Sequence, residues 1–200
     1  MIRNIYLVRH GEPVGVSQRK IFLGQGDPPL SRNGIEQVEI LSGYFKQFAI
    51  SRVFCSDLAR SEETALLITT RLGCQYEVIS SFREINLGTW EGATVSEIKK
   101  RYPSEFQKRG EDPVNFPPPG GESFVDLQNR VIPSLEKIIK HNTGNLLITT
   151  HAGVNKVILT HLLQNDLKQM FNLKQDYGHV HILNEKNTGF TLVKLNYSPL

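Results

Sequence analysis

The chain has 200 residues, of which 39% are hydrophobic and 22% are charged, and its formal net charge is +3. This composition is typical of a globular protein, and we expect one domain over residues 1–200. The charge is too small to indicate a nucleic-acid partner, and no apolar run approaches the length of a membrane span. The first predicted strand follows the initial Met without room for a signal peptide, which predicts a cytoplasmic protein.

The two cysteines and the histidines outside the motifs described below show no spacing that is typical of metal ligands. Cys55 lies in an apolar run and is expected to be buried. His141 and His161 lie on predicted helices, and His179 and His181 have strand spacing, so we expect ordinary structural roles for them. No metal and no cofactor is expected.

The first predicted element is a buried strand over residues 5–8, Ile-Tyr-Leu-Val. Arg9, His10 and Gly11 follow it directly. In open α/β sheets, ligands bind at the carboxyl ends of strands. A guanidinium beside an imidazole suits phosphate, and histidine is one of the side chains that act as nucleophiles. Alone, these three residues fit a solvated loop better than a site, so the rest of the chain decides.

Residues 11–30 are predicted to form a long irregular loop, and long loops in compact domains are often functional. Ser31 is the expected N-cap of the helix that follows. A second short strand is predicted over residues 53–55.

A helix over residues 58–72 is expected next, capped by Ser56 or Asp57 and ending at Gly73. Arg60 lies in its first turn, where the helix dipole disfavours a cation. We therefore expect Arg60 to be directed at a bound anion.

A third strand is predicted over residues 76–79, and the loop after it carries two acids, Glu84 and Glu91. Thr94 and Glu97 have the spacing of a capping box, which predicts a short helix. The stretch from about 94 to 121 becomes rich in charge, Pro and Gly, so we expect a small lid or insertion there. Aromatic side chains in this region either line an apolar pocket or pack within the lid: Trp90, Tyr102, Phe106 and Phe116.

Ser123 is the expected N-cap of the next helix, with Val125, Asn129, Ile132 and Leu135 at loose helical spacing. Pro133 should kink this helix.

Residues 146–150, Leu-Leu-Ile-Thr-Thr, form the clearest predicted strand. His151, Ala152 and Gly153 follow it, before a helix predicted over residues 154–164. A second histidine therefore stands at the carboxyl end of a strand, just as His10 does.

Two final strands are predicted over residues 180–184 and 189–195. Strands that alternate with helices predict an α/β fold. We expect a three-layer αβα sandwich with a mostly parallel, doubly wound sheet and a small lid. A monomer or a homodimer is expected, because the terminal strands offer an edge that is able to pair.

The candidate site combines His10 and His151 with Arg9, Arg60 and Glu84. Such a set suits phosphoryl transfer without a metal, which needs a nucleophile, charge stabilisation on the phosphoryl oxygens and a proton donor for the leaving oxygen. His10 must be neutral to attack, and nearby cations lower its pKa. Glu84 must be protonated in the first step, so a raised pKa is expected near the bound phosphate.

Six motifs occur in order along nearly the whole chain: Arg9-His10-Gly11-Glu12, Ser56-Asp57-Leu58-Ala59-Arg60-Ser61, Arg83-Glu84, Gly88-Thr89-Trp90-Glu91-Gly92, Gly120-Gly121-Glu122-Ser123 and His151-Ala152-Gly153. In this order they resemble the histidine phosphatase superfamily, the phosphoglycerate-mutase-like family. Each motif alone is weak, whereas six in order are highly specific.

The resemblance implies a role for each member of the candidate site. His10 becomes the nucleophile that forms a phosphohistidine. Arg9, Arg60 and His151 bind and neutralise the phosphoryl group. Glu84 protonates the leaving group and then activates water.

The resemblance also implies that Ala152, Gly24 and Gln25 contact the substrate and that Glu12 helps to orient the pocket. Two positions depart from the family pattern. Val16 stands where relatives often have Asn. Leu23 stands where many have a Gln or Ser, and Gln25 would supply the missing amide if the loop is shifted.

The implied partner is a small-molecule phosphomonoester. The mutase branch of the family is generally longer after the Glu84 region, and this chain is short there, so we favour hydrolysis. The loop motifs and Tyr177-Gly178 are most similar to the alpha-ribazole phosphatase group, which acts in cobalamin biosynthesis. A phosphoglycerate-type mutase and a broad-specificity phosphatase are the alternatives. A non-catalytic binding module is disfavoured because both His10 and Glu84 are present.

Overall fold

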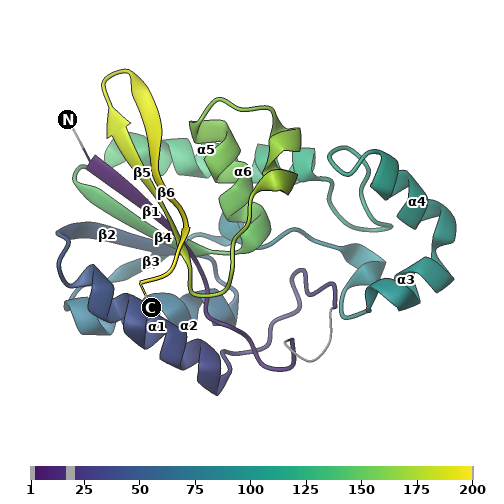
Figure 1. Cartoon of the computed structure of the whole chain (residues 1–200), viewed down its shortest axis with the longest axis horizontal. Helices are drawn as coiled ribbons and strands as arrows, with labels where there is room; N and C mark the ends of the chain where they lie inside the picture. The colour runs from purple at the N-terminus through teal and green to yellow at the C-terminus, as the bar shows by residue number, and fades with distance from the viewer. Residues whose placement is uncertain (1–2, 17–20, 200) are drawn as a thin grey trace.

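The computed structural model describes residues 3–16 and 21–199, and a six-stranded sheet lies at its centre (Figure 1). The strand order is β3-β2-β4-β1-β5-β6. The pairs β1·β4, β2·β4 and β2·β3 are parallel, and β1·β5 and β5·β6 are antiparallel. The strands are β1 (Arg3–Arg9), β2 (Ile50–Cys55), β3 (Tyr76–Val78), β4 (Asn145–Thr150), β5 (Val180–Lys186) and β6 (Gly189–Tyr197).

Long helices cover both faces of this sheet. α1 (Arg32–Phe45) and α2 (Ala59–Leu72) pack on one face, and α5 (Phe124–His141) and α6 (Ala152–Leu162) pack on the other. The expected three-layer αβα sandwich with a mostly parallel sheet is confirmed. An antiparallel hairpin, β5 and β6, completes the sheet at one edge.

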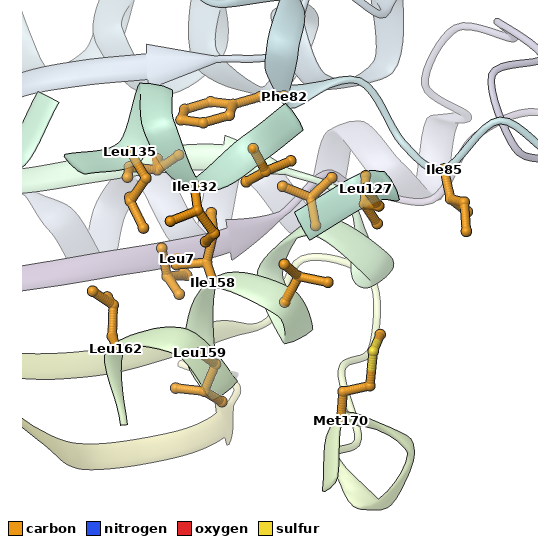
Figure 2. Close-up of a cluster of buried hydrophobic side chains, with 14 of the residues drawn as sticks. Leu7, Phe82, Ile85, Leu127, Ile132, Leu135, Ile158, Leu159, Leu162 and Met170 are labelled. Carbon is orange, nitrogen blue, oxygen red and sulfur yellow. The ribbon is translucent and has the colours of Figure 1, made fainter. Parts of the chain in front are cut away.

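Strand β1 is buried on both faces, because successive side chains point to opposite sides of a strand. Ile5 and Leu7 join the core beneath α5 and α6, whereas Tyr6 and Val8 join the core beneath α1 and α2. Figure 2 shows Leu7 among the apolar side chains of the first core. An anchored strand of this kind gives the polar residues at its carboxyl end a fixed position.

The stretch from 94 to 121 contains two helices, α3 (Val95–Arg101) and α4 (Pro103–Glu111), which lie beyond the end of the sheet (Figure 1). The capping box of Thr94 and Glu97 is confirmed. Helix α4 was not predicted from the Pro- and charge-rich composition. It forms because Pro103 lies in the first turn, where its missing N–H costs nothing. The lid role of this stretch stays a prediction.

The cap of α2 differs from the expected one. Leu58 is the N-cap residue and makes no side-chain cap, and the Ser56 hydroxyl accepts the Leu58 N–H at 3.2 Å. Asp27, in the long loop, accepts the N–H of Ala59 through Oδ1 at 2.8 Å, and Asp57 forms an ion pair with Arg83 at 2.8 Å. The prediction that Ser56 or Asp57 caps α2 is therefore wrong, because the acceptor comes from a distant loop.

Helix α5 begins at the capping box of Ser123 and Asp126 and continues through Pro133. Its buried stripe also differs from the expected one. Leu127 and Val131 point into the core in place of Val125 and Asn129, together with Ile132, Leu135 and Ile138.

Short 3₁₀ helices complete the secondary structure: η1 (Ser80–Phe82), η2 (Gly88–Trp90) and η3 (Leu167–Asn172). Across residues 3–16 and 21–199, no helix has both the length and the apolar character that crossing a bilayer requires.

Candidate active site

Two neighbouring parallel strands bring the motif histidines together. β1 and β4 pair in register with Arg9 opposite Thr150, and the His10 N–H donates to the Thr150 carbonyl at 3.0 Å. The rings of His10 and His151 lie 5.1 Å apart, centroid to centroid. The two histidines that stand at strand ends therefore lie side by side.

The hydrogen bonds of His10 define its tautomer. Its Nδ1 lies 2.7 Å from the Gly11 carbonyl, which can only accept, so Nδ1 carries the proton. Arg60 Nε donates to Nε2 at 3.2 Å, so Nε2 holds a lone pair. Burial, and then Arg60 and Arg9, hold the pKa of His10 well below its usual value. His10 is therefore neutral near pH 7, with a lone pair on Nε2.

Arg60 is almost completely enclosed, with 1% of its surface exposed. The guanidinium donates from Nη1 to the Gly26 carbonyl at 2.6 Å and from Nη2 to the Gly24 carbonyl at 2.8 Å, and Asp27 lies 3.7 Å away. Burial lowers its pKa, but an arginine stays protonated in proteins. The loop after β1 thus encloses a cation at the start of α2, directed at His10.

Arg9 is held from the other side by the segment that precedes β5. Its Nη1 donates to the Gln175 carbonyl at 2.7 Å, and the ring of Tyr177 lies 3.6 Å from the guanidinium carbon. Tyr177 also lies 5.4 Å from the ring of His10. Burial lowers the pKa of Arg9. A stacked, half-buried guanidinium therefore lies beside His10.

His151 is the N-cap residue of α6 and is fully buried. Within the described part of the chain, neither of its ring nitrogens has a hydrogen-bond partner, nor does Arg9 Nε. Burial, then Arg60, His10 and Arg9, lower the pKa of His151 well below its usual value. Buried polar groups are almost always bonded, so such a cluster indicates a place for a ligand with several acceptor oxygens.

Glu84 lies against the first turn of α6. Its Oε2 accepts the N–H of Gly153 at 3.0 Å, and its Oε1 accepts the N–H of Ile85 at 2.9 Å. A Cβ on Gly153 would lie 2.5 Å from Glu84 Oε1, so only a glycine allows this approach. The carboxyl group therefore lies at the same strand end as His151.

Other residues expected to contact the substrate have different partners. Gln25 donates through its side chain to the Glu84 carbonyl at 3.0 Å, and Gly24 accepts from Arg60. Ala152 is the first residue of α6, and the Glu12 carboxylate accepts from Asn33 at 2.8 Å. Val16 and Leu23 are half-buried. Direct contacts of Gly24, Gln25 and Ala152 with the substrate stay a prediction.

The structure adds supporting residues that the sequence analysis missed. Gln175 binds Arg9, as described above. Arg130 donates to the carbonyls of Ser81 and Arg83 and forms an ion pair with Glu122 at 2.8 Å, which fixes the segment before Glu84. No local motif could reveal these contacts, because Gln175 lies far from Arg9 in the sequence, and Arg130 lies far from Ser81 and Arg83.

No group of three or more His, Cys, Asp or Glu in residues 3–16 and 21–199 is arranged to hold a metal ion. The atoms of Arg9 and His151 that have no partner among the described residues are nitrogens, and a guanidinium nitrogen suits an anion.

A comparison with known families agrees with this geometry. The profile described as "Histidine phosphatase superfamily (branch 1)" matches residues 5–198. The chain belongs to the histidine phosphatase superfamily. The family and the enzyme class expected from the six motifs are therefore confirmed at this level.

Curated relatives cover almost all of the chain. Phosphoserine phosphatase 1 of Hydrogenobacter thermophilus is 30% identical over 199 residues, which are 96% of this chain and 91% of that protein. Bifunctional protein Rv2228c of Mycobacterium tuberculosis is 30% identical over 193 residues. The chain spans about half of that relative's length, since the match covers 96% of this chain and 52% of the relative.

Among solved structures, the alpha-ribazole phosphatase of Shigella flexneri is similar with a TM-score of 0.89. The match covers 98% of this chain and 96% of the other, at 24% identity. At this identity the similarity supports the fold and not a substrate.

Proposed function

We propose that the chain is a metal-independent phosphomonoesterase that hydrolyses a small-molecule phosphate ester through a phosphohistidine on His10. The observation that carries this proposal is the fixed tautomer of His10, with the Nε2 lone pair facing the cation of Arg60. The unpartnered nitrogens of Arg9 and His151 support it, because they suit phosphoryl oxygens.

In the first step, Nε2 of His10 forms a bond to phosphorus, and the bond from phosphorus to the ester oxygen breaks. Arg9, Arg60 and His151 donate to the phosphoryl oxygens, whose charge the two guanidinium groups neutralise. The Glu84 carboxyl group gives its proton to the leaving oxygen, which departs as an alcohol.

In the second step, water attacks phosphorus, and the Glu84 carboxylate takes a proton from that water. The N–P bond breaks, the electron pair returns to Nε2, and inorganic phosphate leaves. His10 regains the tautomer that its bonds to Gly11 and Arg60 hold in the free enzyme.

For the substrate we propose alpha-ribazole 5′-phosphate, which would place the reaction in cobalamin biosynthesis. The loop motifs and Tyr177-Gly178, which resemble the alpha-ribazole phosphatase group, support this choice. The name of the Hydrogenobacter relative, phosphoserine phosphatase, points to a different monoester. The experiment is phosphate release in the presence of EDTA from alpha-ribazole 5′-phosphate, phosphoserine, 3-phosphoglycerate and a nitrophenyl ester.

We expect the enzyme to release phosphate fastest from alpha-ribazole 5′-phosphate. EDTA should not change the rate on any ester that the enzyme accepts. Preference for another ester would reject the substrate and keep the phosphatase. Similar rates on all four would indicate a broad-specificity phosphatase. Conversion of 3-phosphoglycerate to its isomer without net phosphate release would instead identify a mutase.

A further inference from the structure

A small apolar cavity lies between the loop after β1 and helix α4, apart from the residues of the phosphoryl site. Its volume is about 190 Å³, and it is lined by Phe22, Trp90, Phe106, Arg109 and Gly110. The ring of Phe22 lies 5.6 Å from Trp90, and the ring of Phe106 lies 6.0 Å from it. Trp90 and Phe106 are two of the aromatic residues that the sequence suggested for an apolar pocket.

Two of the residues that line this cavity, Arg109 and Trp90, carry nitrogen donors. The Arg109 guanidinium carbon lies 6.0 Å from the Trp90 ring and 5.3 Å from the Phe124 ring, and Nη1 donates to the Phe116 carbonyl. No carboxylate in the described part of the chain forms an ion pair with Arg109. The indole N–H of Trp90 is fully buried and has no acceptor there either.

Burial without an opposite charge is costly for Arg109 and lowers its pKa. A carboxylate would remove this cost, because its two oxygens match the planar guanidinium. None of the described residues that line the cavity is acidic. An occupant therefore needs a carboxylate for the cation and an apolar body for the three rings.

The volume limits the size of that occupant. A protein cavity of about 150 Å³ accepts benzene. A cavity of about 190 Å³ thus has room for one ring or a short alkyl chain together with a carboxylate. We propose that this cavity is a second ligand site, which binds a small aromatic or aliphatic carboxylate through Arg109.

The site is connected to the phosphoryl site through the backbone. Phe22 forms two backbone hydrogen bonds with the 92–93 segment, from its N–H to Ala93 and from the Gly92 N–H to its carbonyl. Two residues further along, the Gly24 carbonyl accepts from Arg60. A ligand against Phe22 therefore touches the loop that encloses Arg60, without occupying the place of the phosphate.

The single tryptophan of the chain makes the test direct, because Trp90 forms part of the cavity wall. Phenylacetate is titrated into the protein while tryptophan emission is followed, with phenylacetamide as the neutral probe. We expect a saturable change with phenylacetate, and binding at least about tenfold weaker for phenylacetamide, since the ion pair is lost. Arg109→Gln should weaken phenylacetate binding to a similar extent, whereas Lys108→Gln, an exposed neighbour, should not.

Gly110→Leu provides a second variant that keeps Arg109. A Cβ at Gly110 meets no atom within 4 Å, and Gly110 lines the cavity, so we expect a leucine to fit on the helix and to occupy part of the cavity. Gly110→Leu should abolish the change of tryptophan emission that phenylacetate causes. Its melting temperature should stay unaltered. Saturating vanadate, a phosphate mimic, should leave phenylacetate binding intact. Absence of a saturable change, equal binding of the amide, full binding by Arg109→Gln or Gly110→Leu, or displacement by vanadate would each overturn the proposal.

Discussion

Arg60 donates from Nε to Nε2 of His10 across 3.2 Å, and this bond joins the first turn of α2 to the carboxyl end of β1. In this structure, the cation therefore binds the lone pair that we propose attacks phosphorus. An arriving phosphoryl group offers Arg60 charged oxygens, which are stronger acceptors than a neutral imidazole. If Arg60 exchanges its hydrogen bond to His10 for one to the phosphoryl group, the proposed nucleophile becomes free. The same exchange stabilises the bound anion.

The first prediction concerns the nucleophile. His10→Ala should lower kcat by about 10⁴-fold or more, because the remaining groups can stabilise charge but cannot form the covalent intermediate. A radioactive phosphate ester should label the unmodified protein in an acid-labile, base-stable form. This label should be absent from His10→Ala. His161→Ala is the control, since His161 lies on α6 in an exposed ion pair with Glu136 and should leave both readouts unchanged. Normal turnover by His10→Ala would reject the phosphohistidine.

The second prediction concerns the proton donor. Glu84→Gln should slow hydrolysis of alkyl phosphates by about 10²- to 10⁴-fold and that of a nitrophenyl ester much less, because a nitrophenolate leaves without a proton. The measurement is kcat across esters of increasing leaving-group pKa. Glu77→Gln, exposed on β3, is the matched control. An equal loss on all esters would assign Glu84 a role other than general acid.

The limits of sequence-based prediction are clear at individual residues. Local sequence pattern reveals strand ends and helix starts. The positions of His10, Arg60 and His151 could therefore be predicted, because each lies next to one of these. The cap of α2 by Asp27 and the stacking of Tyr177 on Arg9 could not be predicted. Both depend on where a long loop returns in space, and hydrophobic periodicity contains no information about that. Helix α4 was missed for a different reason, because the Pro and charge content of its segment favoured a loop, whereas Pro103 lies in the first turn, where it is compatible with a helix.

The third prediction concerns stability at acid pH. Burial, then Lys156 and His179, lower the pKa of His181 from 6.5 to about 4. Between these values the unfolded chain binds a proton that the native state does not, so the free energy of unfolding falls as pH falls below 6.5. This histidine alone should remove about 2 kcal/mol between pH 7.5 and pH 5. The lowered pKa values of His10 and His151 add to this loss.

Urea unfolding at the two pH values measures this loss. His181→Gln should reduce the difference between pH 7.5 and pH 5 by about 2 kcal/mol, since the titrating group is gone. His141→Gln, exposed at the end of α5, should not change it. The same pH dependence in both variants would show that His181 titrates normally.

The fourth prediction concerns Glu91, which connects the loop around Arg60 to the segment that carries Glu84. Its Oε1 accepts the N–H of Gln25 at 2.8 Å and that of Leu87 at 3.1 Å, and Gln25 in turn donates to the Glu84 carbonyl. Glu91→Ala should leave two partly buried N–H groups unpaired and lower the free energy of unfolding by about 1–3 kcal/mol.

Loss of this anchor should also loosen the Gly24 and Gly26 carbonyls that hold Arg60. We therefore expect Glu91→Ala to weaken inhibition by inorganic phosphate by about tenfold or more, while kcat falls less. Glu91→Gln keeps an acceptor oxygen and should restore most of the phosphate affinity. A lower melting temperature with unchanged phosphate inhibition would mean that Glu91 stabilises the fold without positioning Arg60.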